Sequence, residues 1–185
     1  MKAIETRYAG HRFRSRLEAR WAVFFDHLDI NWQYEPQGFK FGPYAYLPDF
    51  LLPDTRTWVE VKGDEGALDY DLMEAFADAL PRGERVVILG PIPESRPAGD
   101  WDWAWQSLHS AYIDEDERVV FGDWIGFGPG EPTVLTETSG ATPFEFGIRE
   151  DWLVPVLNMV GPCAAAAYDA ARAARFEHGE SGAPA

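Results

Sequence analysis

Cysteine and histidine are scarce in this chain of 185 residues. Cys163 is the only cysteine, so no intrachain disulfide can form and a zinc site built from several cysteines is excluded. The four histidines show neither the HxH nor the HExxH spacing of common metal sites. The sequence therefore excludes a disulfide framework and the usual zinc signatures.

Basic residues are also in the minority, with 16 Lys and Arg against 31 Asp and Glu and a formal charge of −15. This excludes a nucleic-acid-binding surface that covers the whole protein. The charge is uneven, because residues 1–62 hold nine bases and eight acids, whereas residues 63–185 hold seven bases and 23 acids. Six of the bases lie in the first twenty residues: Lys2, Arg7, Arg12, Arg14, Arg16 and Arg20. A polyanion is expected to bind near that end.

Long apolar runs are absent. The chain has no apolar leader at its N-terminus and no run of about eighteen apolar residues. We expect a soluble, cytoplasmic protein without a membrane partner. Hydrophobic residues make up 46% of the chain and aromatic residues 15%, which is enough for a packed core and excludes the disordered class.

The hydrophobic pattern predicts an α/β fold with a mixed central sheet. The expected core has the order helix, three strands, helix, strand, with these ranges: 15–28, 31–35, 45–52, 57–62, 67–80 and 85–89. Residues 39–41 are expected to extend a hairpin through Gly42 and Pro43. The last strand follows a helical crossover, so it can lie parallel to the strand before it.

The composition changes after Gly90, where a stretch rich in proline and glycine begins. We expect a core domain over 1–90, a C-terminal α+β elaboration packed on it over 91–176, and a disordered tail over 177–185. Within the elaboration the sequence predicts two weak strands, over 119–125 and 133–135, and a mainly helical segment over 151–176. It also predicts a buried apolar stripe formed by Trp101, Trp103 and Trp105. No motif assigns a role to this half.

The segment YLPDFLLPDTRTWVEVKGD, residues 46–64, places charged residues inside two apolar strands. Side chains alternate along a strand, so Glu60 and Lys62 share a face, and the turn can bring Asp49 beside them. Two neighbouring carboxylates repel each other, and Mg²⁺, with Mn²⁺ as a substitute, would remove that penalty. A lysine beside them can orient an attacking water, so the set fits phosphodiester hydrolysis. The structural alternative is a cross-strand salt bridge at a sheet edge.

Pro48-Asp49 followed by Glu60-Val61-Lys62 resembles the PD-(D/E)xK signature of restriction-endonuclease-like nucleases, and residues 12–62 are most similar to TnsA-like and phage-type endonucleases. The resemblance implies a restriction-endonuclease-like core and a metal-dependent endonuclease that acts on DNA, although the residues alone do not separate DNA from RNA. It implies that Asp49, Glu60 and the Val61 carbonyl bind the metal and that Lys62 assists the nucleophile. Glu18, on the first helix, matches a further catalytic glutamate of that group.

Glu18 also has a structural alternative. Ser15-Arg16-Leu17-Glu18 fits a capping box, in which the Glu18 side chain would bond the Ser15 N–H. The arginines that flank this segment are open to two interpretations as well, either contact with nucleic-acid phosphates or a solvated face that balances nearby acids, for example Arg14 with Glu18. They are Arg12, Arg14, Arg16 and Arg20.

The acidic second half favours a narrow substrate-facing patch, a homodimer or a partner subunit over non-specific duplex binding by this chain alone. It also motivates a rival hypothesis of another class, a non-catalytic interaction protein that is either a degenerate nuclease domain or an acidic mimic of nucleic acid. The intact set of Asp49, Glu60 and Lys62 argues against that rival.

Overall fold

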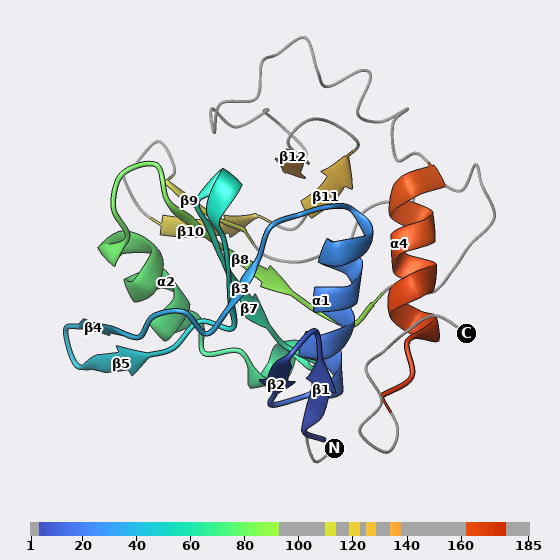
Figure 1. Ribbon diagram of the computed structural model, residues 1–185. Helices are drawn as coiled ribbons and strands as arrows, with labels where there is room; N and C mark the ends of the chain where they lie inside the picture. Colours follow the sequence, from blue (N-terminus) through green and yellow to red (C-terminus); the bar gives the residue numbers. More distant parts are fainter. Residues whose placement is uncertain are drawn as a thin grey trace, which may run out of the picture.

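A six-stranded mixed sheet forms the centre of the protein, in the computed structural model shown in Figure 1. The structure describes residues 4–92, 110–113, 119–122, 125–128, 134–137 and 162–176. The strand order is β10-β9-β8-β7-β6-β3. The strands are β3 (Gln33–Tyr34), β6 (Phe50–Leu52), β7 (Thr57–Val61), β8 (Arg85–Leu89), β9 (Ser110–Ile113) and β10 (Val119–Gly122). Among the neighbouring strands of this sheet, only β7 and β8 run parallel to each other. This confirms the predicted crossover and the mixed α/β class.

Helices cover both faces of the sheet. Helix α1 (Arg16–His27) and helix α4 (Pro162–Ala173) lie side by side on one face, and α2 (Tyr70–Ala79) lies on the other (Figure 1). Helix α1 begins where the Ser15 side chain accepts a hydrogen bond from the Glu18 N–H, and α2 begins where Asp69 does the same for Leu72. Each cap satisfies a backbone donor that has no partner within its helix.

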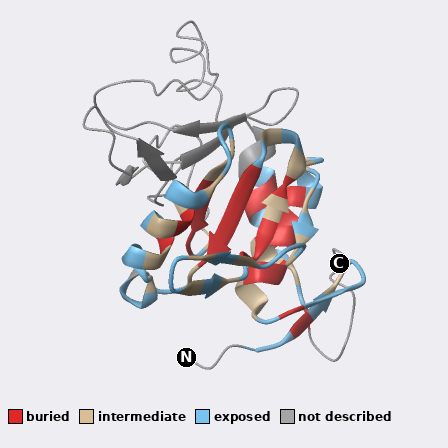
Figure 2. Ribbon diagram, turned by 90° about the vertical axis from the view of Figure 1, so that its left-hand side faces the viewer, coloured by how far each residue is buried: buried red, intermediate tan, exposed pale blue. Residues whose placement is uncertain are grey.

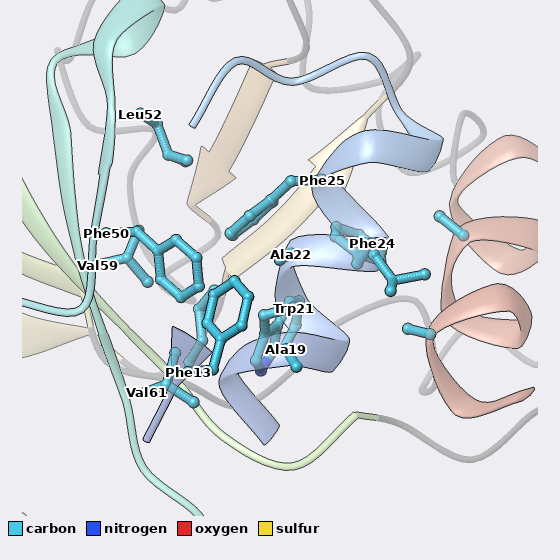
Figure 3. Packing of buried hydrophobic residues seen from close by; sticks show 14 of the residues in the cluster. Phe13, Ala19, Trp21, Ala22, Phe24, Phe25, Phe50, Leu52, Val59 and Val61 are labelled. Carbon is cyan, nitrogen blue, oxygen red and sulfur yellow. The ribbon is translucent and has the colours of Figure 1, made fainter. Parts of the chain in front are cut away.

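The main core lies between the sheet and α1. Phe50 and Val59 point from the sheet toward Trp21 and Phe25 on α1 (Figure 3). Tyr168 of α4 stacks on Phe24 at a ring-centroid distance of 4.5 Å. Figure 2 shows the buried residues gathered along the central strands and the helices packed on them. Full burial of each such side chain contributes about 1.5–3 kcal/mol, so this cluster holds α1 and α4 to the sheet.

The predicted strand over 45–52 is in fact two strands. Strand β5 (Tyr44–Tyr46) pairs with β4 (Phe39–Phe41) in a separate hairpin, and only β6 joins the central sheet. Pro48 lies between them, and a proline cannot donate a ladder hydrogen bond. The strand predicted over 57–62 ends at Val61, and the helix predicted over 67–80 begins only at Tyr70.

An N-terminal hairpin was not predicted. Strand β1 (Thr6–Tyr8) pairs with β2 (His11–Phe13) through a turn at Ala9 and Gly10, whose φ angles are 46° and 81°. Two consecutive positive φ values are typical of the two-residue type I′ turn that joins twisted strands. The three-residue strands are too short for a clear alternation in the sequence.

Beyond residue 90, β9 and β10 extend the central sheet past β8, so the sheet does not end where the sequence pattern changed. Strands β11 (Ile125–Gly128) and β12 (Val134–Glu137) form a separate antiparallel pair. The tryptophan stripe, residues 151–161 and the tail over 177–185 lie outside the described residues. Within the described ranges, no helix combines the length and apolar character needed to cross a membrane.

Candidate active site

Asp49 directly precedes β6 and Glu60 lies on the neighbouring strand β7, and both are buried, with exposed fractions of 3% and 6%. Phe50 and Leu52 of β6 pack toward α1, so the alternating pattern directs Asp49, just before β6, to the opposite face. The Val61 N–H donates a hydrogen bond of 2.7 Å to Asp49 Oδ2. This bond fixes the Asp49 carboxylate against the end of β7, next to Glu60.

Lys62 neutralises the Glu60 carboxylate, and Tyr46 helps to orient it. Lys62 Nζ lies 2.5 Å from Glu60 Oε1, and the Tyr46 hydroxyl donates a hydrogen bond of 2.6 Å to Glu60 Oε2. Lys62 follows directly on β7 and its side chain is 33% exposed. Glu60 and Lys62 therefore project together, and a partly exposed ammonium group pairs with the buried carboxylate.

Arg14 neutralises Asp49. Its Nη2 atom lies 2.7 Å from Asp49 Oδ1, and its Nε atom lies 2.7 Å from Glu35 Oε1. The Glu35 N–H in turn donates a hydrogen bond of 2.9 Å to the Asp49 carbonyl oxygen. Glu35 has a φ of 43°, in the left-handed region that a glutamate seldom adopts. The chain thus holds a third carboxylate beside Asp49 at the cost of backbone strain.

Glu18 is buried in the first turn of α1, with 6% of its surface exposed. Its Oε2 atom accepts hydrogen bonds from the Arg14 N–H at 3.0 Å and from the Tyr34 hydroxyl at 2.7 Å. Only half of the expected capping box is found, because the Glu18 side chain reaches the N–H of Arg14 and not that of Ser15. The expected ion pair between Arg14 and Glu18 is wrong, since the Arg14 guanidinium pairs with Asp49 and Glu35 instead.

The electrostatics of the site are dominated by buried negative charge. Burial, together with the charges of Glu60 and Glu18, raises the pKa of Asp49 to about 7, although the Val61 N–H and Arg14 act in the opposite direction. Burial and the negative charge of Glu60 also raise the pKa of Tyr46 well above its usual 10, so its hydroxyl remains a donor. An additional cation at Asp49 would relieve this excess of negative charge.

The donor set fits Mg²⁺ better than a softer metal. No cluster of three or more His, Cys, Asp or Glu side chains arranged to hold a metal occurs among the described residues. Asp49 and Glu60 supply two carboxylates, and each carboxylate oxygen can accept more than the one bond it now receives. The Val61 carbonyl faces the same side as its N–H, toward Asp49, because both groups of a strand residue point one way. Mg²⁺ is commonly held by one or two carboxylates and several waters, so Asp49 and Glu60 are the residues that could hold it.

The other three arginines form no ion pair with these carboxylates within the described part of the chain. Arg12, on β2, pairs with Glu5 and stands directly opposite Arg7 of β1. Arg16 and Arg20 lie one turn apart on α1 and are half-buried. Among the described residues, Arg14 is therefore the one of the four predicted arginines that pairs with the carboxylate cluster.

Sequence reasoning missed Tyr34, Glu35 and Tyr46. In an unbroken strand, Tyr46 and Asp49 would point to opposite faces, and only the interruption at Pro48 lets both reach the carboxylate cluster. The proline was the available signal for Tyr46, because it breaks the ladder. Nothing in the sequence marks the left-handed conformation of Glu35, since a residue before proline favours extended backbone.

Comparison with known proteins leaves the function to be argued from these residues. Neither a scan of protein-family models nor searches of curated proteins and solved structures found a match to this chain.

Proposed function

We propose that this protein is a Mg²⁺-dependent endonuclease of the PD-(D/E)xK kind that hydrolyses phosphodiester bonds in DNA. The observation that carries the proposal is the pair of buried carboxylates, Asp49 and Glu60, at one end of the β6–β7 hairpin, with Lys62 beside them. The order of α1, three sheet strands, α2 and β8 adds support, because restriction-endonuclease-like cores have the same order.

Each residue has a distinct role in this proposal. Asp49, Glu60 and the Val61 carbonyl would hold the metal, which supplies charge neutralisation on the phosphate and an easily deprotonated water. Lys62 is the partly exposed cation, so it donates to the nucleophile or to the developing negative charge. Glu18 is a positioning residue, since it fixes the backbone of Arg14 through a 3.0 Å hydrogen bond.

DNA contact is assigned to the arginines near the N-terminus. Arg16 and Arg20 are half-buried on α1, while Arg12 is 66% exposed on the hairpin. We expect the Arg16→Ala/Arg20→Ala variant to bind a DNA duplex more weakly and with a shallower dependence on salt. With fewer phosphate contacts, binding releases fewer counterions from the DNA. Fluorescence anisotropy across a salt titration measures this. Unchanged affinity and slope would remove both arginines from the interface.

A panel of substrates tests the proposed activity. Purified protein is incubated with Mg²⁺, Mn²⁺ or EDTA and with duplex, single-stranded and branched DNA and RNA. Cleavage of DNA is expected with either metal, and none with EDTA or in Asp49→Asn and Lys62→Ala. Asp54→Asn is the matched control, because Asp54 is an exposed carboxylate beyond the other end of β6. Equal cleavage by Asp49→Asn and wild type would refute the proposal.

One observation favours the non-catalytic alternative. Each of the four oxygens of Asp49 and Glu60 already has a partner supplied by the chain itself: Arg14, Val61, Lys62 and Tyr46. A degenerate domain could keep such a self-neutralised cluster for stability alone. In that case no substrate in the panel is cleaved, and Mg²⁺ leaves the melting temperature unchanged.

A further inference from the structure

Arg14 occupies an unusual position for a residue expected to contact nucleic acid. Its guanidinium group bridges Asp49 and Glu35, with 2.7 Å between the paired atoms on each side. The Arg14 side chain is nevertheless 57% exposed, so solvent reaches it from one side. Arg14 is thus a solvent-accessible cation placed against a buried carboxylate.

The two oxygens of Asp49 differ in what holds them. Oδ2 accepts the Val61 N–H, a backbone group that cannot leave without opening the end of β7. Among the residues that the structure describes, only the Arg14 guanidinium contacts Oδ1. An incoming metal ion therefore has one replaceable neighbour on Asp49, and that neighbour is Arg14.

Glu35 keeps Arg14 in place. Its Oε1 atom is buried and lies 2.7 Å from Arg14 Nε, without the alignment of a proper hydrogen bond. The positive φ of 43° at Glu35 and its backbone bond to Asp49 fix this carboxylate beside the site. Strained residues cluster at functional sites and switch regions, so the backbone of Glu35 agrees with a functional role for its ion pair with Arg14.

We propose that Arg14, held by Glu35, is a built-in counter-ion that competes with a divalent metal ion for Asp49. The inference rests on the proposed function, because it takes Asp49 as a metal ligand. Without metal, Arg14 neutralises the site and limits the repulsion among the carboxylates. When metal binds, Arg14 is released and its guanidinium becomes available for a substrate phosphate, which couples metal binding to DNA binding.

The test is the affinity for Mg²⁺ alone, measured by isothermal titration calorimetry without nucleic acid. We expect Arg14→Gln to bind Mg²⁺ about three- to tenfold more tightly than wild type, because the competing cation and its repulsion are gone. Arg56→Gln is the matched control, since Arg56 is an exposed arginine at the turn after β6, and it should leave the affinity unchanged. If Arg14→Gln does not fold in EDTA, Arg14→Lys replaces it, because lysine cannot span both carboxylates.

Glu35 gives a second, independent measurement. Glu35→Gln removes a nearby negative charge and weakens Mg²⁺ binding. Where Arg14 is present, the same substitution also loosens Arg14 from Asp49, which favours Mg²⁺ binding. The loss of affinity should therefore be smaller in wild type than in the Arg14→Gln background, and a double-mutant cycle measures the difference.

The outcomes separate this inference from the proposed function. Tighter binding by Arg14→Gln supports the competition, including the case in which wild type shows no binding and the variant does. Equal or weaker binding by Arg14→Gln overturns the competition and leaves the metal site standing. If neither protein binds Mg²⁺, both proposals fail.

Discussion

Replacing Asp49 with asparagine should change how the stability of the protein depends on pH. Burial, and after it the charges of Glu60 and Glu18, raise the pKa of Asp49 from its ordinary 3.8 to about 7. A group whose pKa is raised on folding stabilises the protein fully below its unfolded pKa. That stability is lost as the pH rises through the folded pKa.

The expected magnitude follows from this shift. Each pKa unit of difference between the folded and unfolded states is worth about 1.4 kcal/mol. With a folded pKa near 7, the free energy of unfolding of wild type should fall by about 2.5 kcal/mol from about pH 5 to about pH 8, relative to a variant that cannot titrate at this position. No discount for solvent applies, because Asp49 is only 3% exposed.

Urea denaturation in EDTA, followed by circular dichroism at both pH values, measures this difference for wild type and Asp49→Asn. Comparing the two pH values cancels the cost of placing the asparagine amide near the Arg14 guanidinium, which does not depend on pH. If Asp49→Asn instead loses stability relative to wild type as the pH rises, Asp49 is held as a stabilising ion pair. The excess of negative charge that favours a metal would then be absent.

Two further substitutions test the contacts around the site and the core. Tyr46→Phe removes the hydroxyl that donates to Glu60 and should cost about 1.5–3 kcal/mol of unfolding free energy in urea denaturation, whereas Tyr44→Phe on the same strand should cost under about 0.5 kcal/mol. Equal costs would refute the role of the Tyr46 hydroxyl. Tyr168→Ala removes the ring stacked on Phe24 and should cost about 3–5 kcal/mol in the same assay. A cost below about 1 kcal/mol would show that α4 does not hold the core together.

Much of the sheet could be predicted from the sequence, because hydrophobic period and punctuation act locally. Val86 to Leu89 form an unbroken apolar run, which is typical of a strand buried on both faces, and β8 is parallel to β7 as expected. Glu60 and Lys62 project together because strand alternation is a backbone property. The position of Asp49 beside Glu60 could also be predicted, because the short turn between β6 and β7 lets the two strands pair.

The contacts that complete the site could not be predicted, because they depend on long-range packing. Arg14 meets Asp49 across 35 positions of sequence, and the strained backbone of Glu35 brings a further carboxylate to the same guanidinium. Helical periodicity predicted α1 well but gave no reason for the Glu18 side chain to choose Arg14 over Ser15. Pairing of β9 with β8 is equally remote from any local signal.

Cleavage of a fluorescently labelled DNA duplex in Mg²⁺, compared with the same reaction in EDTA, tests the central claim most directly. Wild type and the Asp54→Asn control should cut the duplex only when the metal is present, and Asp49→Asn should not cut it under either condition. Cleavage that persists in EDTA, or that Asp49→Asn performs as well as wild type, would contradict the assignment of Asp49 and Glu60 as the metal-binding centre of a nuclease.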